Sequence, residues 1–108
     1  MKTELNLNEK LIEEGRANLQ KGFEAVGGFL YLTNQRLIFE SHKVNIQTGN
    51  TIIDLSNIAS TKKIWTKLFN IIPVVPNSLA VKCVDEQEYR FVLSGRGYWE
   101  YKINQNIS

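Results

Sequence analysis

The chain has 108 residues, 43% of them hydrophobic and 22% charged, which is typical of one globular domain (residues 1–108) and excludes a disordered tail. No apolar run approaches the roughly 18 residues that span a bilayer, no secretory signal is evident at the N-terminus, and the lone cysteine excludes an internal disulfide, so a cytoplasmic location is expected. The net charge of +2 falls short of a nucleic-acid-binding footprint, so no nucleic-acid partner is expected.

The first half of the chain predicts short β-strands joined by turns. A first strand is expected at about residues 16–20, after a break at Gly15, and a glycine-containing connection follows at residues 21–28. Residues 29–39 carry large apolar side chains on both sides of Asn34, which tolerates a tight turn, and therefore predict a β-hairpin. Apolar residues on both faces of its second arm indicate a strand between the core and a covering element. A turn at residues 48–50 joins an expected strand at residues 44–46 to the next strand.

The second half predicts more strands and then a helix. The strands are expected at residues 52–55, 60–65, 79–84 and 88–93. The period then changes, because Trp99, Ile103 and Ile107 recur every four residues, as on one stripe of a helix, with Ser94 as the expected N-cap. Seven short strands followed by one amphipathic helix predict a mainly β fold.

Several of these stretches resemble one family. The string Leu-Tyr-Leu-Thr-Asn-Gln-Arg-Leu-Ile-Phe at residues 30–39 resembles the second and third strands of GRAM domains, a branch of the pleckstrin-homology (PH) superfold. Gly27-Gly28, residues 51–55 with Ile58, Tyr89-Arg90-Phe91 and Trp99 extend the resemblance over about residues 12–103. It implies a small, stand-alone, bacterial-type member with a PH-like seven-stranded antiparallel, partly open barrel of two near-orthogonal sheets, capped by a C-terminal α-helix.

The resemblance also implies an adaptor or membrane-targeting module that binds lipid or protein and is not catalytic. The best-known phosphoinositide site of PH domains uses a Lys…(Lys/Arg)-x-Arg arrangement on the first two strands. This chain departs from it, because Lys21 stands beside Glu24 and is followed by the apolar residues 29–32, with no Arg-x-Arg. Specific phosphoinositide recognition at that position is therefore not expected.

The residues that could carry out catalysis are few. His42 is the only histidine and Cys83 the only cysteine, and Cys83 is expected on the buried face of a strand, where cysteine behaves as a small hydrophobe. No cluster has the spacing of metal ligands, and residues 95–97 (Gly-Arg-Gly) lack the Lys-Ser/Thr ending of a phosphate loop. We therefore expect no enzyme activity, no cofactor and no metal.

Residues 60–77 are unusual for a connection between strands. All eleven acidic residues lie outside residues 55–84, which carry four lysines and hence a charge of +4, whereas the rest of the chain sums to −2. Among the lysines are large apolar residues, which connecting loops seldom contain. Pro73 and Pro76 argue against a regular strand near its end. The candidate site drawn from this segment is Lys62, Lys63, Trp65, Lys67, Leu68 and Phe69.

Three interpretations of this segment remain open. In the first, Leu68, Phe69, Ile71 and Ile72 fold back over the barrel opening as core. In the second, the apolar tip dips into the headgroup region of an anionic membrane while the lysines face the lipid. In the third interpretation the same surface binds another protein or a second copy of the chain, with Trp65 as an anchor beside cations. The position of the Trp65 and Phe69 side chains decides between burial and display.

Overall fold

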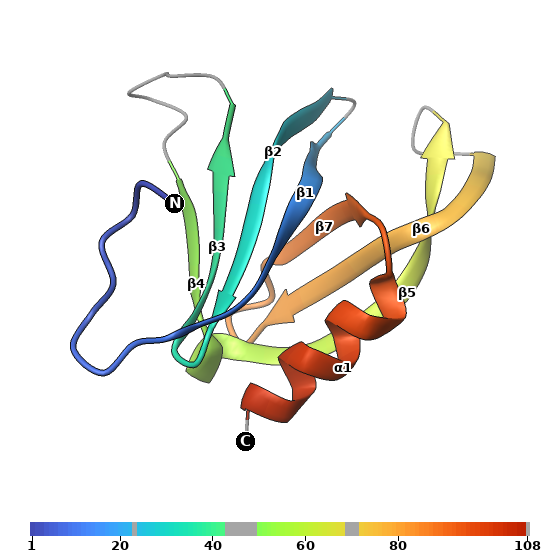
Figure 1. The fold of residues 1–108 in the computed structure, drawn as a ribbon. Helices are drawn as coiled ribbons and strands as arrows, with labels where there is room; N and C mark the ends of the chain where they lie inside the picture. The colour runs from blue at the N-terminus through green and yellow to red at the C-terminus, as the bar shows by residue number, and fades with distance from the viewer. Residues whose placement is uncertain (23, 43–49, 69–71, 108) are drawn as a thin grey trace.

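The computed structural model describes residues 1–22, 24–42, 50–68 and 72–107. These residues form seven β-strands, one short 3-10 turn and one α-helix (Figure 1). Their bounds are β1 Leu11–Lys21, β2 Glu24–Thr33, β3 Arg36–Ser41, β4 Thr51–Asp54, η1 Leu55–Asn57, β5 Ile58–Leu68, β6 Ile72–Cys83, β7 Glu88–Leu93 and α1 Arg96–Ile107. The mainly β fold with a C-terminal helix is therefore confirmed.

The strands form one curled antiparallel sheet in the order β4-β3-β2-β1-β7-β6-β5. Its two halves meet where β1 pairs with β7 over four residue pairs, whereas β1 and β2 pair over ten. One half holds β1–β4 and the other β5–β7, and in Figure 1 the strands of the two halves run in clearly different directions. The halves correspond to the two predicted sheets. The edge strands β4 and β5 do not pair, so the barrel is partly open, and α1 lies across the β5–β6 side.

The core lies between the curled sheet and α1, as the alternation of apolar residues predicts. Leu30, Leu32, Leu37 and Phe39 of the β2–β3 hairpin are fully or almost fully buried, as are the inward residues of β6 and β7. On α1 the predicted stripe is confirmed, because Trp99 and Ile103 are buried and Ile107 packs partly against the same cluster. Gly28 allows β2 and β3 to approach closely, since a Cβ there would overlap the backbone carbonyl of Glu40.

The predicted covering element over the outer face of β3 is the N-terminal segment, residues 2–10. Glu9 accepts two hydrogen bonds from the Arg36 guanidinium, at 2.7 and 2.9 Å, and one from the Thr33 hydroxyl. Glu40 accepts the backbone N–H groups of Lys2 and Thr3 at 2.7–3.0 Å. The hydrogen bonds from Arg36 are the main reason that the pKa of Glu9 falls from 4.5 to about 2 despite the burial of its side chain.

Four local predictions are wrong. Gly15 lies inside β1 rather than before it, and most of the predicted connection at residues 21–28 belongs to β2. Gly95, at φ 70°, stands directly before the first helical residue and its carbonyl accepts the Trp99 N–H, so Ser94 is not the N-cap. β6 begins at Ile72 and includes both prolines. The predicted strand at residues 44–46 and most of its turn lie outside the described residues.

Candidate binding surface on the β5–β6 hairpin

The segment predicted as a connecting loop is the distal part of a long β-hairpin. β5 pairs with β6 from Ile58↔Cys83 out to Leu68↔Ile72. β6 pairs with β7 only between Ser78 and Lys82, so residues 72–77 have β5 as their one neighbouring strand. We call residues 65–68 and 72–77 the hairpin arm. In Figure 1 the arm extends beyond β7, away from the β1–β4 half of the sheet.

The prolines fit this arm because the ladder is irregular there. Pro73 and Pro76 lie beyond the part of β6 that pairs with β7, so no hydrogen bond to β7 needs their missing N–H groups. The β5–β6 register shifts between Ile64 and Thr66 and again between Thr66 and Lys67. The Thr66 hydroxyl contacts the side chains of Asn77 and Ser78 at this point, which ties the two strands together.

The described apolar side chains of the arm are displayed to solvent. Trp65 is 49% exposed, Ile72 55%, Val74 46% and Val75 43%, and none of them belongs to the core cluster. The interpretation in which Leu68, Phe69, Ile71 and Ile72 fold back as core is therefore wrong for Ile72, the one of the four whose side chain the structure describes. Phe69 lies outside the described residues, as does the side chain of Leu68. Four exposed large apolar side chains on one short arm make it a candidate contact site for a partner or a membrane.

The three predicted lysines are exposed but do not share one face. Lys62 and Lys67 line a depression of about 320 Å³ on the outer face of β5, β6 and β7. Lys63 does not line it, and its ammonium group lies near Gly97 at the start of α1. Among the described residues none of the three has a carboxylate within salt-bridge distance. Lysines on an edge strand also hinder pairing with a foreign strand, which is a structural role independent of any ligand.

The structure adds two cations that the sequence analysis did not place in the site. Lys82 of β6 and Arg90 of β7 line the same depression as Lys62 and Lys67. The pairing of the strands places both residues there. Lys62 pairs with Ala80 and Ala80 pairs with Arg90, while Lys82 lies two residues further along β6 on the same face. The alternation of Arg90 with Phe91 signals an outward side chain, but the sequence alone does not reveal which strand lies beside which.

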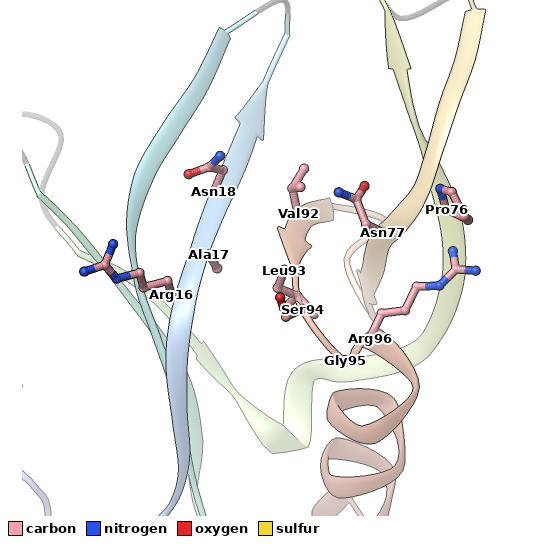
Figure 2. Close-up of a pocket in the computed structure, with 10 residues that line it drawn as sticks. All are labelled: Arg16, Ala17, Asn18, Pro76, Asn77, Val92, Leu93, Ser94, Gly95 and Arg96. Atoms are coloured by element: carbon pink, nitrogen blue, oxygen red, sulfur yellow. The ribbon is translucent and has the colours of Figure 1, made fainter.

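A second hollow, of about 410 Å³, is lined by residues of β1, β6 and β7 and by the start of α1 (Figure 2). Its two arginines are engaged elsewhere. Arg96 donates to the Ile64 carbonyl at 2.6 Å and so anchors the base of the hairpin to α1, while Arg16 lies 6.0 Å from the centre of the Phe29 ring. In Figure 2 the Arg16 side chain points away from the other labelled residues, so the hollow does not assemble a pair of cations.

The residues considered for catalysis have different neighbours. Cys83 is buried at the base of β6, and burial, reinforced by the Asp85 carboxylate, raises the pKa of its thiol, which makes it a poor nucleophile. His42 packs its ring edge on Phe29, with the ring centres 5.2 Å apart. Among the residues that the structure describes, no group of three or more His, Cys, Asp or Glu could hold a metal ion.

A family comparison identifies the fold class. The model of the GRAM domain family matches residues 1–97. The chain belongs to the GRAM domain family. This confirms the resemblance carried by the hairpin string, Gly27-Gly28 and Tyr89-Arg90-Phe91. GRAM domains and PH-like folds are generally non-catalytic binding modules, often for lipids or proteins. No curated protein matches the sequence of this GRAM domain.

Solved structures confirm the PH-like fold. The C-terminal domain of an unknown protein from Leishmania infantum has a TM-score of 0.76 at 16% identity and covers 94% of this chain and 86% of its own. The Vps36 N-terminal PH domain has a TM-score of 0.70 at 16% identity, with coverages of 96% and 83%. The DH/PH domain of human ARHGEF11, solved with human RhoA and an inhibitor, scores 0.71 at 13% identity, covering 92% of this chain and 29% of that one.

Within the described residues of this GRAM domain, no helix is both long and apolar enough to cross a membrane.

Proposed function

We propose that this GRAM domain, folded as a single module over residues 1–108, is a non-catalytic binding module of the cytoplasm that associates peripherally with anionic membranes through its hairpin arm. In the arm and directly beside it, Lys62, Lys63 and Lys67 supply the charge, and Trp65, Leu68 and Phe69 supply apolar contact. The observation that carries the proposal is the exposure of the arm's apolar side chains next to lysines that have no described acidic partner. No cofactor takes part.

The energetics favour weak, reversible binding. A basic residue at an anionic surface contributes about 1 kcal/mol. Burying a large apolar side chain completely contributes about 1.5–3 kcal/mol, and the arm's residues are only half-exposed, so each contributes about half of that. Association and ordering offset much of the sum. The expected binding is therefore salt-sensitive, as for a protein that visits membranes rather than one anchored in them.

Vesicle co-sedimentation tests the proposal. We expect the protein to pellet with phosphatidylcholine vesicles that contain phosphatidylserine, at low salt, and to be released at high salt or when phosphatidylserine is omitted. The emission of Trp65 should shift to the blue on binding, while Trp99, which is buried, changes little. Sedimentation only at background level under low salt would refute the proposal.

Matched variants locate the contact. Replacing Lys62, Lys63 and Lys67 by glutamine should lower vesicle binding by roughly 100-fold, at about 1 kcal/mol for each lysine. The control replaces Lys2, Lys10 and Lys102 by glutamine, which removes the same charge away from the arm. Equal losses in the two variants would show that overall charge, and not the arm, is responsible.

A second candidate function uses the same surface for a protein partner or for self-association. It is favoured by the position of β5, which is an edge strand with Trp65 exposed beside cations. Light scattering over a range of protein concentrations tests whether the chain self-associates. A mass that rises with concentration, and falls back in Trp65→Ala, would support a homo-oligomer. A constant monomer mass would exclude self-association.

A further inference from the structure

The outer face of β5, β6 and β7 carries a depression with a marked excess of positive charge. Lys62, Lys67, Lys82 and Arg90 line it together with a single carboxylate, Glu88, which gives the lining a net charge of +3. Its volume of about 320 Å³ is at the lower end of the range of small-molecule sites. A ligand that fills it must therefore be small and anionic.

The cations are available to such a ligand. Lys82 pairs with Glu86 at 3.1 Å and Arg90 with Glu88 at 3.0 Å, but all four side chains are 39–80% exposed. Ion pairs exposed to this extent contribute little and exchange partners readily. Lys62 and Lys67 have no acidic partner within salt-bridge distance among the residues that the structure describes. A bound anion would meet little competition from the protein's own carboxylates.

The strand register explains why this face is hollow. Lys62, Ala80 and Arg90 stand side by side on three adjacent strands. Strands lie about 4.8 Å apart, so the two cationic residues flank the small Ala80 side chain, and their backbones are about 10 Å from each other. Ser60, Lys82 and Glu88 form the next row, which adds a hydroxyl donor and the one carboxylate of the lining. A small floor, cations on both sides and a hydroxyl suit a phosphate monoester, which carries nearly two negative charges and three acceptor oxygens.

The depression also adjoins the surface proposed to meet the membrane. Lys67, at its distal end, pairs with Pro73 of the hairpin arm, next to the exposed Ile72 and Val74. If the arm enters the headgroup layer, Lys67 and the depression behind it lie at the level of the phosphates. This step rests on the proposed function, whereas the charge and shape of the depression do not.

We infer that this depression binds the phosphate monoester of an anionic lipid headgroup, held by Lys62, Lys67, Lys82 and Arg90. The site lies on the β5–β6–β7 face and is separate from the position on the first two strands where Lys21 and Glu24 stand. Membrane association then has two parts, a general one through the arm and a selective one through the depression.

The test compares two sets of vesicles with matched zeta potential. One set contains phosphatidylserine, whose phosphate is a diester. The other contains phosphatidic acid or phosphatidylinositol monophosphates, which carry a phosphate monoester. We expect roughly tenfold tighter binding to at least one monoester lipid. Amide NMR shifts with soluble inositol phosphate should centre on Ser60, Lys62, Ala80 and Arg90.

Two pairs of variants separate the depression from general charge. Lys62→Gln should remove the preference for monoester lipid and lower binding about fivefold, whereas Lys63→Gln, on the opposite face of the same strand, should keep the preference. Ser60→Glu places an acid in the depression and should abolish the preference, while Ser56→Glu, exposed outside it, should not. All four positions are solvent-exposed, so the variants should fold.

The possible results distinguish this inference from the proposed function. Equal binding to both vesicle sets, with equal losses in Lys62→Gln and Lys63→Gln, would overturn the phosphate site and leave membrane association standing. Background sedimentation with every vesicle would overturn both. If inorganic phosphate or a soluble inositol phosphate binds the depression as tightly as vesicles do, the ligand is a free phosphate compound and the lipid assignment is wrong.

Discussion

The β2–β3 and β5–β6 hairpins are similarly rich in large apolar residues, yet their exposure is opposite. Leu30, Leu32 and Phe39 of the β2–β3 hairpin are at most 2% exposed, whereas Trp65 and Ile72 of the hairpin arm are about half-exposed. The difference lies in their neighbours. β1 and β4 flank the first hairpin and the N-terminal segment covers its outer face, but the arm extends past the last residue that pairs with β7.

The comparison shows that one part of the sheet buries its apolar side chains in the core, whereas another part exposes them to solvent. Burial of the β2–β3 hairpin contributes to folding, because its apolar surface is removed from water in the native state. The apolar surface of the arm remains largely hydrated, so its burial is still available for association with a partner or a membrane. This division predicts that substitutions in the two regions affect different measurements.

The two tryptophans give the largest expected contrast. Trp99 of α1 is 5% exposed and fills the open side of the sheet, so Trp99→Ala should lower the free energy of unfolding by about 3–5 kcal/mol. Trp65→Ala removes a half-exposed side chain and should lower it by less than about 1 kcal/mol. Urea denaturation followed by circular dichroism measures both. Similar losses in the two variants would mean that the arm is part of the folding core.

The ion pair that attaches the N-terminal segment to β3 should have the next largest effect. Glu9→Gln removes the buried carboxylate that hydrogen-bonds Arg36 and leaves only the longer-range attraction of Asp54 for the Arg36 charge, so we expect a loss of about 3 kcal/mol at neutral pH. Glu14→Gln, at an exposed position of β1, is the control and should change the stability by less than about 0.5 kcal/mol.

The pH dependence of this effect follows from the lowered pKa of Glu9. The native pKa of about 2 lies below the ordinary value of 4.5, so the ionised form stabilises the fold fully above about pH 4.5. That contribution is lost as the pH falls towards 2, and the difference between Glu9→Gln and the unmodified protein should shrink over the same range. A difference that stays constant from neutral pH to pH 3 would contradict this account.

The β2–β3 hairpin was predictable because its local pattern and its family resemblance agree, and because the alternation of Leu30, Leu32 and Leu37 reports burial directly. The N-terminal segment was not, since Glu9 and Arg36 are 27 residues apart and each alone is typical of a solvated surface. The arm was misread as a loop because Pro73 and Pro76 usually interrupt strands. The six candidate residues between Lys62 and Phe69 were proposed from composition, but Arg90 joins Lys62 only through a strand register that long-range contacts determine.

The smallest effect on stability is expected for a substitution within the arm. A buried and an exposed valine of the same strand allow a direct comparison. Val74 and Val81 both lie on β6, but Val74 is 46% exposed and Val81 is fully buried. Val81→Ser should lower the free energy of unfolding by about 3 kcal/mol, because it leaves a cavity and buries a hydroxyl. Val74→Ser should change it by less than about 0.5 kcal/mol. Urea denaturation of the two variants measures this difference.

Vesicle binding should respond in the opposite sense within this pair. Val74→Ser weakens apolar contact of the arm with the headgroup region and should reduce binding to anionic vesicles several-fold while the protein stays folded. Val81→Ser, measured at a temperature where it remains folded, should bind vesicles normally, because its side chain contacts only the core. If Val74→Ser left vesicle binding unchanged, the exposed valine would be an incidental feature of an overlong hairpin, and charge alone would account for any association with membranes.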